Sequence, residues 1–243
     1  MPTFSKTRSG EKILKLSETV INNTLNDPTI LQKVSEFGYN SEKLNQGKQL
    51  LENANEKYEQ SLLLSGKQQD LTESVKEAFA IAKQAYQDLS NVAKAVFKND
   101  KGKLAQLGLT SRMPRTIAEF IVSGIALFEN IEKSDEIKNK LQEYGYDNAK
   151  IKTEKLKIIE LQNIDNQQEA AKGEAQNATK EKEKAIKDLY DWTMQYLKIA
   201  RVALKQNKQL LEKLGTRVYS QKTSKQRGAA KKAAATKKNK KQS

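Results

Sequence analysis

The 243-residue sequence contains no cysteine and no histidine. Without cysteine the chain has neither disulfides nor a thiol nucleophile, and its composition gives no indication of the redox compartment. Without histidine it lacks the commonest general base and the commonest transition-metal ligand. Ser–His and Cys–His catalytic pairs are therefore excluded, as is the Glu-x-x-His di-iron motif of helical bundles.

Proline and glycine are also scarce, with 3 and 11 residues. These are too few turn formers for a protein of many short strands, whereas the abundant Lys, Glu, Gln, Leu and Ala favour helices. No apolar run approaches the roughly 18–20 residues that span a bilayer, so no transmembrane segment is predicted. Residues 1–10 lack the apolar stretch of a secretory signal, which gives a cytoplasmic location as the expectation.

Motifs for bound cofactors or metals are missing as well. The sequence has no glycine-rich phosphate loop and no Asp/Asn-rich calcium loop. Carboxylates such as Glu52, Glu56 and Glu59 are plentiful, but they alternate with lysine as on a solvated helix face. We therefore expect a protein that is not an enzyme, with no catalytic residue, no cofactor and no metal site.

An internal repeat relates the two halves of the chain at one constant offset, which takes residue 37 to residue 144. Residues 37–40, Phe-Gly-Tyr-Asn, resemble residues 144–147, Tyr-Gly-Tyr-Asp. The same offset pairs Gly66 with Gly173 and the Leu-Gly of residues 107–108 with that of residues 214–215. Apolar positions also correspond, for example Ile30 with Ile137 and Val92 with Ile199, and no gap is needed. These matches indicate a tandem duplication.

Each copy is predicted to contain four helices. The first spans residues 11–26 or 117–133, and a short second helix ends at Gly38 or Gly145. The third begins near residue 41 or 148 and turns at Gly66 or Gly173, and the fourth spans residues 70–99 or 177–214. One apolar stripe per helix predicts an all-α fold with an antiparallel four-helix bundle in each copy. The expected domains are residues 1–108 and 109–215.

Local signals support the helix starts and corners. Thr116 with Glu119 forms a capping box, and Asp27 is an N-cap followed by proline, a role that Ser134 takes in the second copy. Tyr39 and Tyr146 follow the helix-ending glycines, so both are predicted to pack at a corner between helices. Trp192 and Phe97 are predicted to pack in the core or between the two copies.

The copies differ at Leu62, Leu63 and Leu64, whose counterparts at residues 169–171 are Glu-Ala-Ala. One interpretation makes these leucines a contact for a partner protein or a second copy. The other, which we favour from the sequence, has them cap the end of the bundle or touch the other copy.

Basic charge is concentrated in the C-terminal tail, residues 216–243. The chain has 44 basic and 30 acidic residues, a net charge of +14, of which the tail contributes ten basic residues and no acid. Residues 221–243 also lack Val, Ile, Leu, Phe, Tyr and Trp, so the tail is predicted to be disordered in isolation. The candidate nucleic-acid-binding residues are Lys222, Lys225, Arg227, Lys231, Lys232, Lys237, Lys238, Lys240 and Lys241.

Residues 229–241 resemble in composition the Lys/Ala-rich tails of linker-histone-like proteins. That resemblance covers the tail alone and implies non-specific binding of DNA or RNA through phosphate contacts. Residues 225–241 also contain two basic clusters, as a nuclear-import signal has in a eukaryote, so an association with a nucleoid or nucleus is compatible with the sequence. Anionic lipid, an acidic protein surface and a purely solubilising role are the alternatives.

The sequence leads to one preferred hypothesis of function and two alternatives. The preferred hypothesis is a helical scaffold or adaptor that its tail tethers to nucleic acid without sequence specificity, with a protein partner or self-association through the body. The first alternative is a structural subunit of a larger assembly, in which the tail makes assembly or solubilising contacts. The second is a bundle that binds a small ligand, or an enzyme of unknown type.

Overall fold

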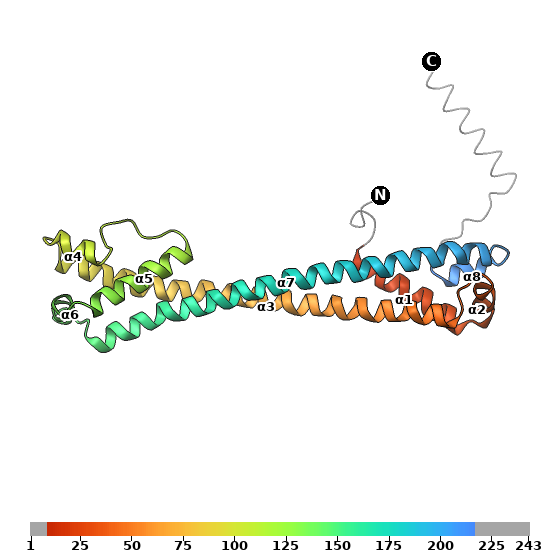
Figure 1. Cartoon of the computed structure of the whole chain (residues 1–243), viewed down its shortest axis with the longest axis horizontal. Coiled ribbons are helices and arrows are strands. Elements are labelled where there is room, and N and C mark those ends of the chain that lie inside the picture. The colour runs from red at the N-terminus through yellow and green to blue at the C-terminus, as the bar shows by residue number, and fades with distance from the viewer. Residues whose placement is uncertain (1–8, 217–243) are drawn as a thin grey trace, which may run out of the picture. The chain divides into compact units, whose positions relative to one another are not determined.

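A computed structural model of the chain describes residues 9–216, and every regular element in that range is an α-helix (Figure 1). This confirms the predicted all-α class. The tail residues from 217 onward, including every candidate nucleic-acid-binding residue, lie outside the described range. The helices are α1 (Gly10–Asn26), α2 (Pro28–Ser35), α3 (Ser41–Val96), α4 (Lys101–Gln106), α5 (Ile117–Glu132), α6 (Asp135–Gln142), α7 (Asn148–Ala203) and α8 (Lys208–Lys213).

The offset of the sequence repeat recurs in the helix boundaries. It takes both ends of α2, α3 and α4 onto the ends of α6, α7 and α8, and it takes the first residue of α1 onto that of α5. The left-handed glycines follow the same spacing, because Gly38 and Gly145 have φ of 85° and 82°, and Gly108 and Gly215 have φ of 71° and 69°. A side chain with a Cβ is strained at such φ values, so glycine ends these helices at matching positions.

The turn predicted at Gly66 and Gly173 is wrong. Helices α3 and α7 are each 56 residues long and run through these glycines without a break. A glycine inside a helix costs only about 1 kcal/mol, and the neighbouring Ser, Lys, Gln and Glu residues tolerate or favour the helical state. The segments predicted as separate third and fourth helices are therefore one helix, α3 or α7, and a short helix, α4 or α8, follows it.

Replacing Gly66 with alanine is expected to stabilise the protein by about 0.5–1 kcal/mol. Gly66 is exposed, it has no positive φ, and nothing lies within 4 Å of a Cβ built on it. Alanine therefore gains helix propensity without a steric cost. Urea denaturation, monitored by the helical signal in far-UV circular dichroism, measures the change in the free energy of unfolding. A loss of stability would show that the helix is not continuous at this position.

The described residues form two compact units, and each combines segments of both copies. Unit 1 contains residues 9–56 and 183–216, and unit 2 contains residues 57–182. These boundaries differ from the predicted domains at residues 1–108 and 109–215. The physical reason is the continuity of α3 and α7, because each long helix contributes residues to both units.

In unit 1, α1 packs against the C-terminal half of α7. Ser17 Oγ lies 2.8 Å from Thr193 Oγ1 in a buried hydrogen bond, and the Thr24 hydroxyl forms another with the Tyr196 hydroxyl. Asn23 Nδ2 donates to the backbone oxygen of Lys213, which joins α1 to α8. The apolar core around these contacts consists of Val20, Ile30, Val34, Tyr39, Leu44, Tyr196, Leu197, Ala200, Leu204, Leu211 and Leu214.

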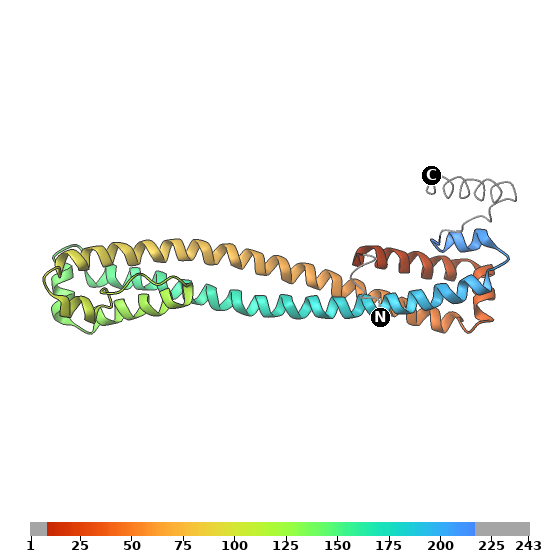
Figure 2. The same ribbon diagram turned by 90° about the horizontal axis from the view of Figure 1, so that it is seen from above.

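In unit 2, α5 packs against α3 and α7 (Figures 1 and 2). Phe120 makes edge-to-face contacts with Phe79 and Tyr86 of α3, at centroid distances of 5.1 and 5.4 Å. On the other side, a Cβ built on Gly124 would lie 3.0 Å from the Ile158 side chain of α7. The hydrogen bond from Asn130 Nδ2 to the backbone oxygen of Gln106 repeats the Asn23–Lys213 contact of unit 1.

The predicted helix caps are confirmed. Thr116 and Glu119 form both hydrogen bonds of the capping box at the start of α5. Asp27 accepts from the backbone N–H groups of Thr29 and Ile30 and precedes the proline that begins α2. Ser134 caps α6 by accepting from the N–H of Ile137.

Candidate protein-interaction surface

An apolar groove of about 680 Å³ lies between α3 and α7 in unit 2. We refer to it as the α3/α7 groove. Two of its apolar side chains are more than half exposed, Ile81 at 56% and Leu156 at 61%. The lining residues are Ser74, Glu77, Ala78, Ile81, Leu156, Lys157, Ile159, Glu160, Asn163 and Ile164.

Helical periodicity places these side chains on one side of each helix. Ser74, Ala78 and Ile81 follow one another at steps of four and three residues along α3, and Leu156 and Ile159 are three residues apart on α7. The contacts of α5 use a different set of residues, among them Phe79 and Ile158. The groove is thus left open by the helix that completes the core of unit 2.

The rim of the groove carries unneutralised acid on both helices. Glu77 of α3 and Glu160 of α7 are exposed, and neither forms an ion pair within residues 9–216. Lys157, the lining residue with a positive charge, is already engaged by Glu154, with Nζ 2.6 Å from Oε2. The groove therefore combines apolar side chains with acidic ones. We refer to Ile81, Leu156, Ile159 and Ile164 as its apolar floor and to Glu77 and Glu160 as its acidic rim.

Three apolar positions of the groove have polar counterparts in unit 1. The repeat alignment matches Ile81 with Asp188, Leu156 with Gln49 and Ile159 with Glu52. All three counterparts are exposed. The same helix geometry thus accommodates charge and amide groups at these positions in unit 1. The apolar character of the groove is a property of unit 2 that the repeat does not require.

The Leu62–Leu64 segment lies in the middle of α3 rather than at a turn. Leu62 and Leu63 are 59% and 74% exposed, Leu64 is half-buried, and the neighbouring Ser61 is buried. These leucines therefore do not cap a bundle end, because α3 continues through them. The other part of the favoured interpretation, that they touch the other copy, stays a prediction. Leu63 precedes Ile81 by five helical turns, so both lie on the same side of α3, about 27 Å apart along its axis.

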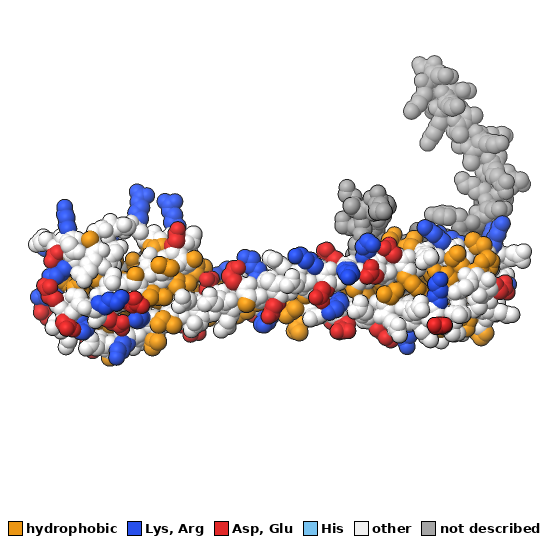
Figure 3. Space-filling view, in the orientation of Figure 1, with side chains coloured by type: hydrophobic (Ala, Val, Ile, Leu, Met, Phe, Trp, Pro, Cys, Tyr) orange, Lys and Arg blue, Asp and Glu red, His pale blue; other side chains and the backbone are white. Residues whose placement is uncertain are grey.

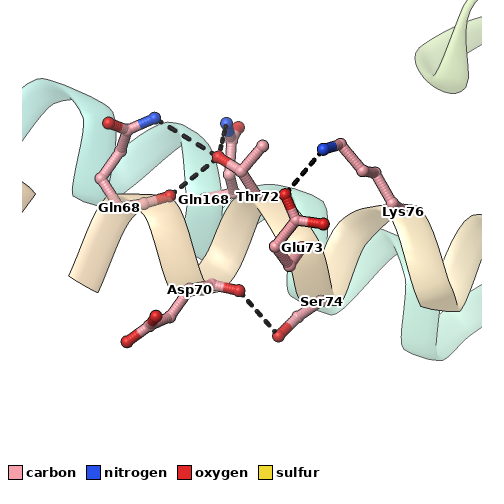
Figure 4. Close-up of polar contacts among 7 residues, drawn as sticks. All are labelled: Gln68, Asp70, Thr72, Glu73, Ser74, Lys76 and Gln168. Carbon is pink, nitrogen blue, oxygen red and sulfur yellow. Dashed lines mark hydrogen bonds and ion pairs between the residues drawn. The ribbon is translucent and has the colours of Figure 1, made fainter. Parts of the chain in front are cut away.

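Polar and small side chains line the contact between α3 and α7 in this stretch. Thr72 Oγ1 donates to the backbone oxygen of Gln68 at 2.8 Å and accepts from Gln168 Nε2 of α7 at 3.4 Å (Figure 4). Lys67 pairs with Glu174, its counterpart in the repeat alignment, at 3.4 Å. The side chains buried nearby are small, namely Ser61, Ala171, Ala175 and Ala178. Small residues let the two helices approach closely, but they bury little apolar area.

The body of the protein does not gather its basic residues into one long patch on the face shown in Figure 3. Lys and Arg alternate there with Asp and Glu. Several lysines are held by acids of other helices, such as Lys103 by Glu136 and Lys155 by Glu132. That face therefore offers no long basic patch as an alternative to the tail.

The aromatic residues of unit 1 form a packed cluster. Tyr39 is 2% exposed and contacts Trp192 and Tyr196 edge to face, while the last two rings stack with centroids 5.7 Å apart. Burial raises the pKa of Tyr196 to about 12, against a smaller opposing effect of its hydrogen bond with Thr24. Tyr39 Oη and Trp192 Nε1 are buried without a hydrogen-bond partner among the described residues. A Cβ on Gly47 would lie 2.3 Å from the Trp192 ring, so the indole occupies the space beside this glycine.

Sequence reasoning did not identify the α3/α7 groove, although one signal was present. The apolar residues at positions 81, 156 and 159 are aligned with polar residues of the other copy.

Among residues 9–216, no group of three potential His, Cys, Asp or Glu ligands lies close enough to hold a metal ion. Within the same range, no helix is long and apolar enough to cross a membrane. Comparisons of the chain with known protein families, with curated proteins and with solved structures find no match.

Proposed function

We propose that the chain is a non-enzymatic helical adaptor that binds a protein in the α3/α7 groove and is tethered to nucleic acid by its basic tail. The observation that carries the protein-binding half is the exposed apolar floor of the groove, which has charged or amide residues at its counterparts in unit 1. Burying a large aliphatic side chain contributes about 1.5–3 kcal/mol. Ile81 and Leu156 are both mostly exposed, so a partner that covers them would gain binding free energy of this kind.

The nucleic-acid half rests on the tail. Residues 216–243 carry ten basic and no acidic side chains, whereas the rest of the chain has a net charge of only +4. Lysines brought close to phosphates release condensed counterions, so binding of this kind is independent of sequence and weakens steeply with salt. DNA and RNA are both suitable partners for such a segment.

Removing residues 216–243 is expected to abolish binding to double-stranded DNA and to single-stranded RNA. With six to ten phosphate contacts, the full chain should lose about 10³–10⁵-fold in DNA affinity between 50 and 200 mM salt. Fluorescence anisotropy of labelled oligonucleotides measures both effects across a salt series. The matched control is a full chain with Ile81→Asp and Leu156→Gln, which should bind DNA as the wild type does.

Equal binding by the full and shortened chains would refute the tether. The alternative function, a structural subunit of an assembly, would then gain support, and it is favoured by the exposed Leu62 and Leu63 on α3. It requires a discrete oligomer that survives removal of the tail, which light scattering detects.

A further inference from the structure

We infer that the occupant of the α3/α7 groove is an amphipathic helix of a partner protein, with an apolar stripe flanked by lysine or arginine. The inference rests on the proposed function, since it specifies the chemistry of the protein that the adaptor holds. It is drawn from the shape of the groove, from the charge of its rim and from the comparison with unit 1.

The shape of the groove suits a helix. Its lining comes from about two turns of α3, residues 74–81, and of α7, residues 156–164. At 1.5 Å per residue this is roughly 12 Å of helix, enough for apolar anchors spaced at i, i+3 or i+4, and i+7 on a docked helix. Ile81, Leu156, Ile159 and Ile164 supply the complementary apolar surface.

The charge of the rim selects the flanks of that helix. Glu77 and Glu160 stand on the two different helices that line the groove, both exposed and without an ion pair in the described part of the chain. Lys157 is held by Glu154 and does not compensate them. A docked helix with basic residues on both sides of its apolar stripe therefore meets an acid on each side. Such rim pairs contribute mainly to selectivity and orientation.

Two other occupants fit less well. A second copy packed groove to groove would bring together two copies of Glu77 and two of Glu160, with the lining lysine already paired. The chain's own tail is basic, but residues 221–243 have no large apolar side chain to fill the floor. Only a helix that is both apolar and basic matches both features.

The probe for this inference is a short fluorescein-labelled, end-blocked peptide with leucine at one helical stripe and lysine elsewhere. A second peptide has glutamate in place of every lysine. Fluorescence anisotropy with the full-length protein should give at least tenfold tighter binding of the lysine peptide. Ile81→Asp with Leu156→Gln, which installs two residues of unit 1 at their equivalent positions, should weaken that binding at least tenfold.

Two further variants test the separate parts. Glu77→Gln with Glu160→Gln should reduce the preference for the lysine peptide at least threefold and leave the folded state intact, since both groups are exposed. Val122→Asp, which makes the same kind of change at a 69% exposed aliphatic residue of α5 outside the groove, should have no effect. Helical circular dichroism shows that each variant is folded.

The inference is overturned if both peptides bind equally, or if the groove variants bind the lysine peptide as the wild type does. It is also overturned if sedimentation velocity shows a wild-type dimer that Ile81→Asp with Leu156→Gln dissociates, because the occupant is then a second copy. DNA binding measured on the same proteins separates these outcomes from failure of the tether. If the wild type binds neither peptide but still binds DNA, the partner chemistry alone is rejected.

Discussion

Replacing Phe120 with alanine is expected to lower the free energy of unfolding by about 3–5 kcal/mol, the range for truncation of a buried aromatic side chain. Phe120 is fully buried on α5 and contacts the rings of Phe79 and Tyr86 on α3. Its removal eliminates both edge-to-face pairs and leaves a cavity at the contact that holds α5 to the long helix. Urea denaturation followed by circular dichroism measures the loss.

A matched control lies two positions further along the same helix. Val122 is 69% exposed, so Val122→Ala should change stability by less than about 0.5 kcal/mol, as surface substitutions usually do. Phe120→Leu, which keeps part of the buried volume, should fall between the two. If Phe120→Ala and Val122→Ala had the same small effect, α5 would not be packed against α3 through this face.

Local chemistry allowed much of the secondary structure to be predicted. The caps at Asp27, Thr116 and Ser134 depend on side chains within one turn of the helix start, and they form as expected. The glycines that end α2 and α6 depend on a backbone conformation that only glycine adopts without strain. Each of these signals acts over one turn of chain, which is why the sequence alone is sufficient to read it.

Whether a long helix continues through a glycine depends on the cost of that glycine compared with the hydrogen bonds and packing of a continuous helix. The amino-acid composition does not reveal which of these is larger. Gly38 and Gly66 are the same residue type, yet one ends a helix and the other lies inside one. The penalty for an interior glycine is small compared with the hydrogen bonds and packing of a continuous helix. The prediction treated both glycines as helix ends, and this error divided each long helix into two.

The α3/α7 groove could not be predicted from the sequence for a related reason. Its two walls are far apart in the sequence, at Ile81 and Leu156 for example, and no local pattern shows that these residues meet. Once the pairing of α3 with α7 is known, the repeat alignment becomes informative, because it supplies Asp188 and Gln49 as polar counterparts at equivalent positions. Tertiary pairing therefore had to come first.

Replacing Gly47 with alanine is expected to destabilise the protein by about 1–3 kcal/mol, the opposite sign to Gly66→Ala. A Cβ at Gly47 would lie 2.3–2.7 Å from three carbons of the Trp192 indole. The indole cannot yield easily, because it stacks on Tyr196 and meets Tyr39 edge to face. This overlap outweighs the roughly 1 kcal/mol that alanine gains in helix propensity.

The repeat supplies the means to test this cause. The equivalent positions of the other copy show the reverse arrangement, with Glu154 in place of Gly47 and Ala85 in place of Trp192. In a Trp192→Ala background, which itself should cost about 3–5 kcal/mol, Gly47→Ala is expected to become neutral or stabilising. A double-mutant cycle by urea denaturation measures the coupling. If Gly47→Ala costs the same in both backgrounds, the indole is not the obstacle, and the glycine is required for some property of α3 itself.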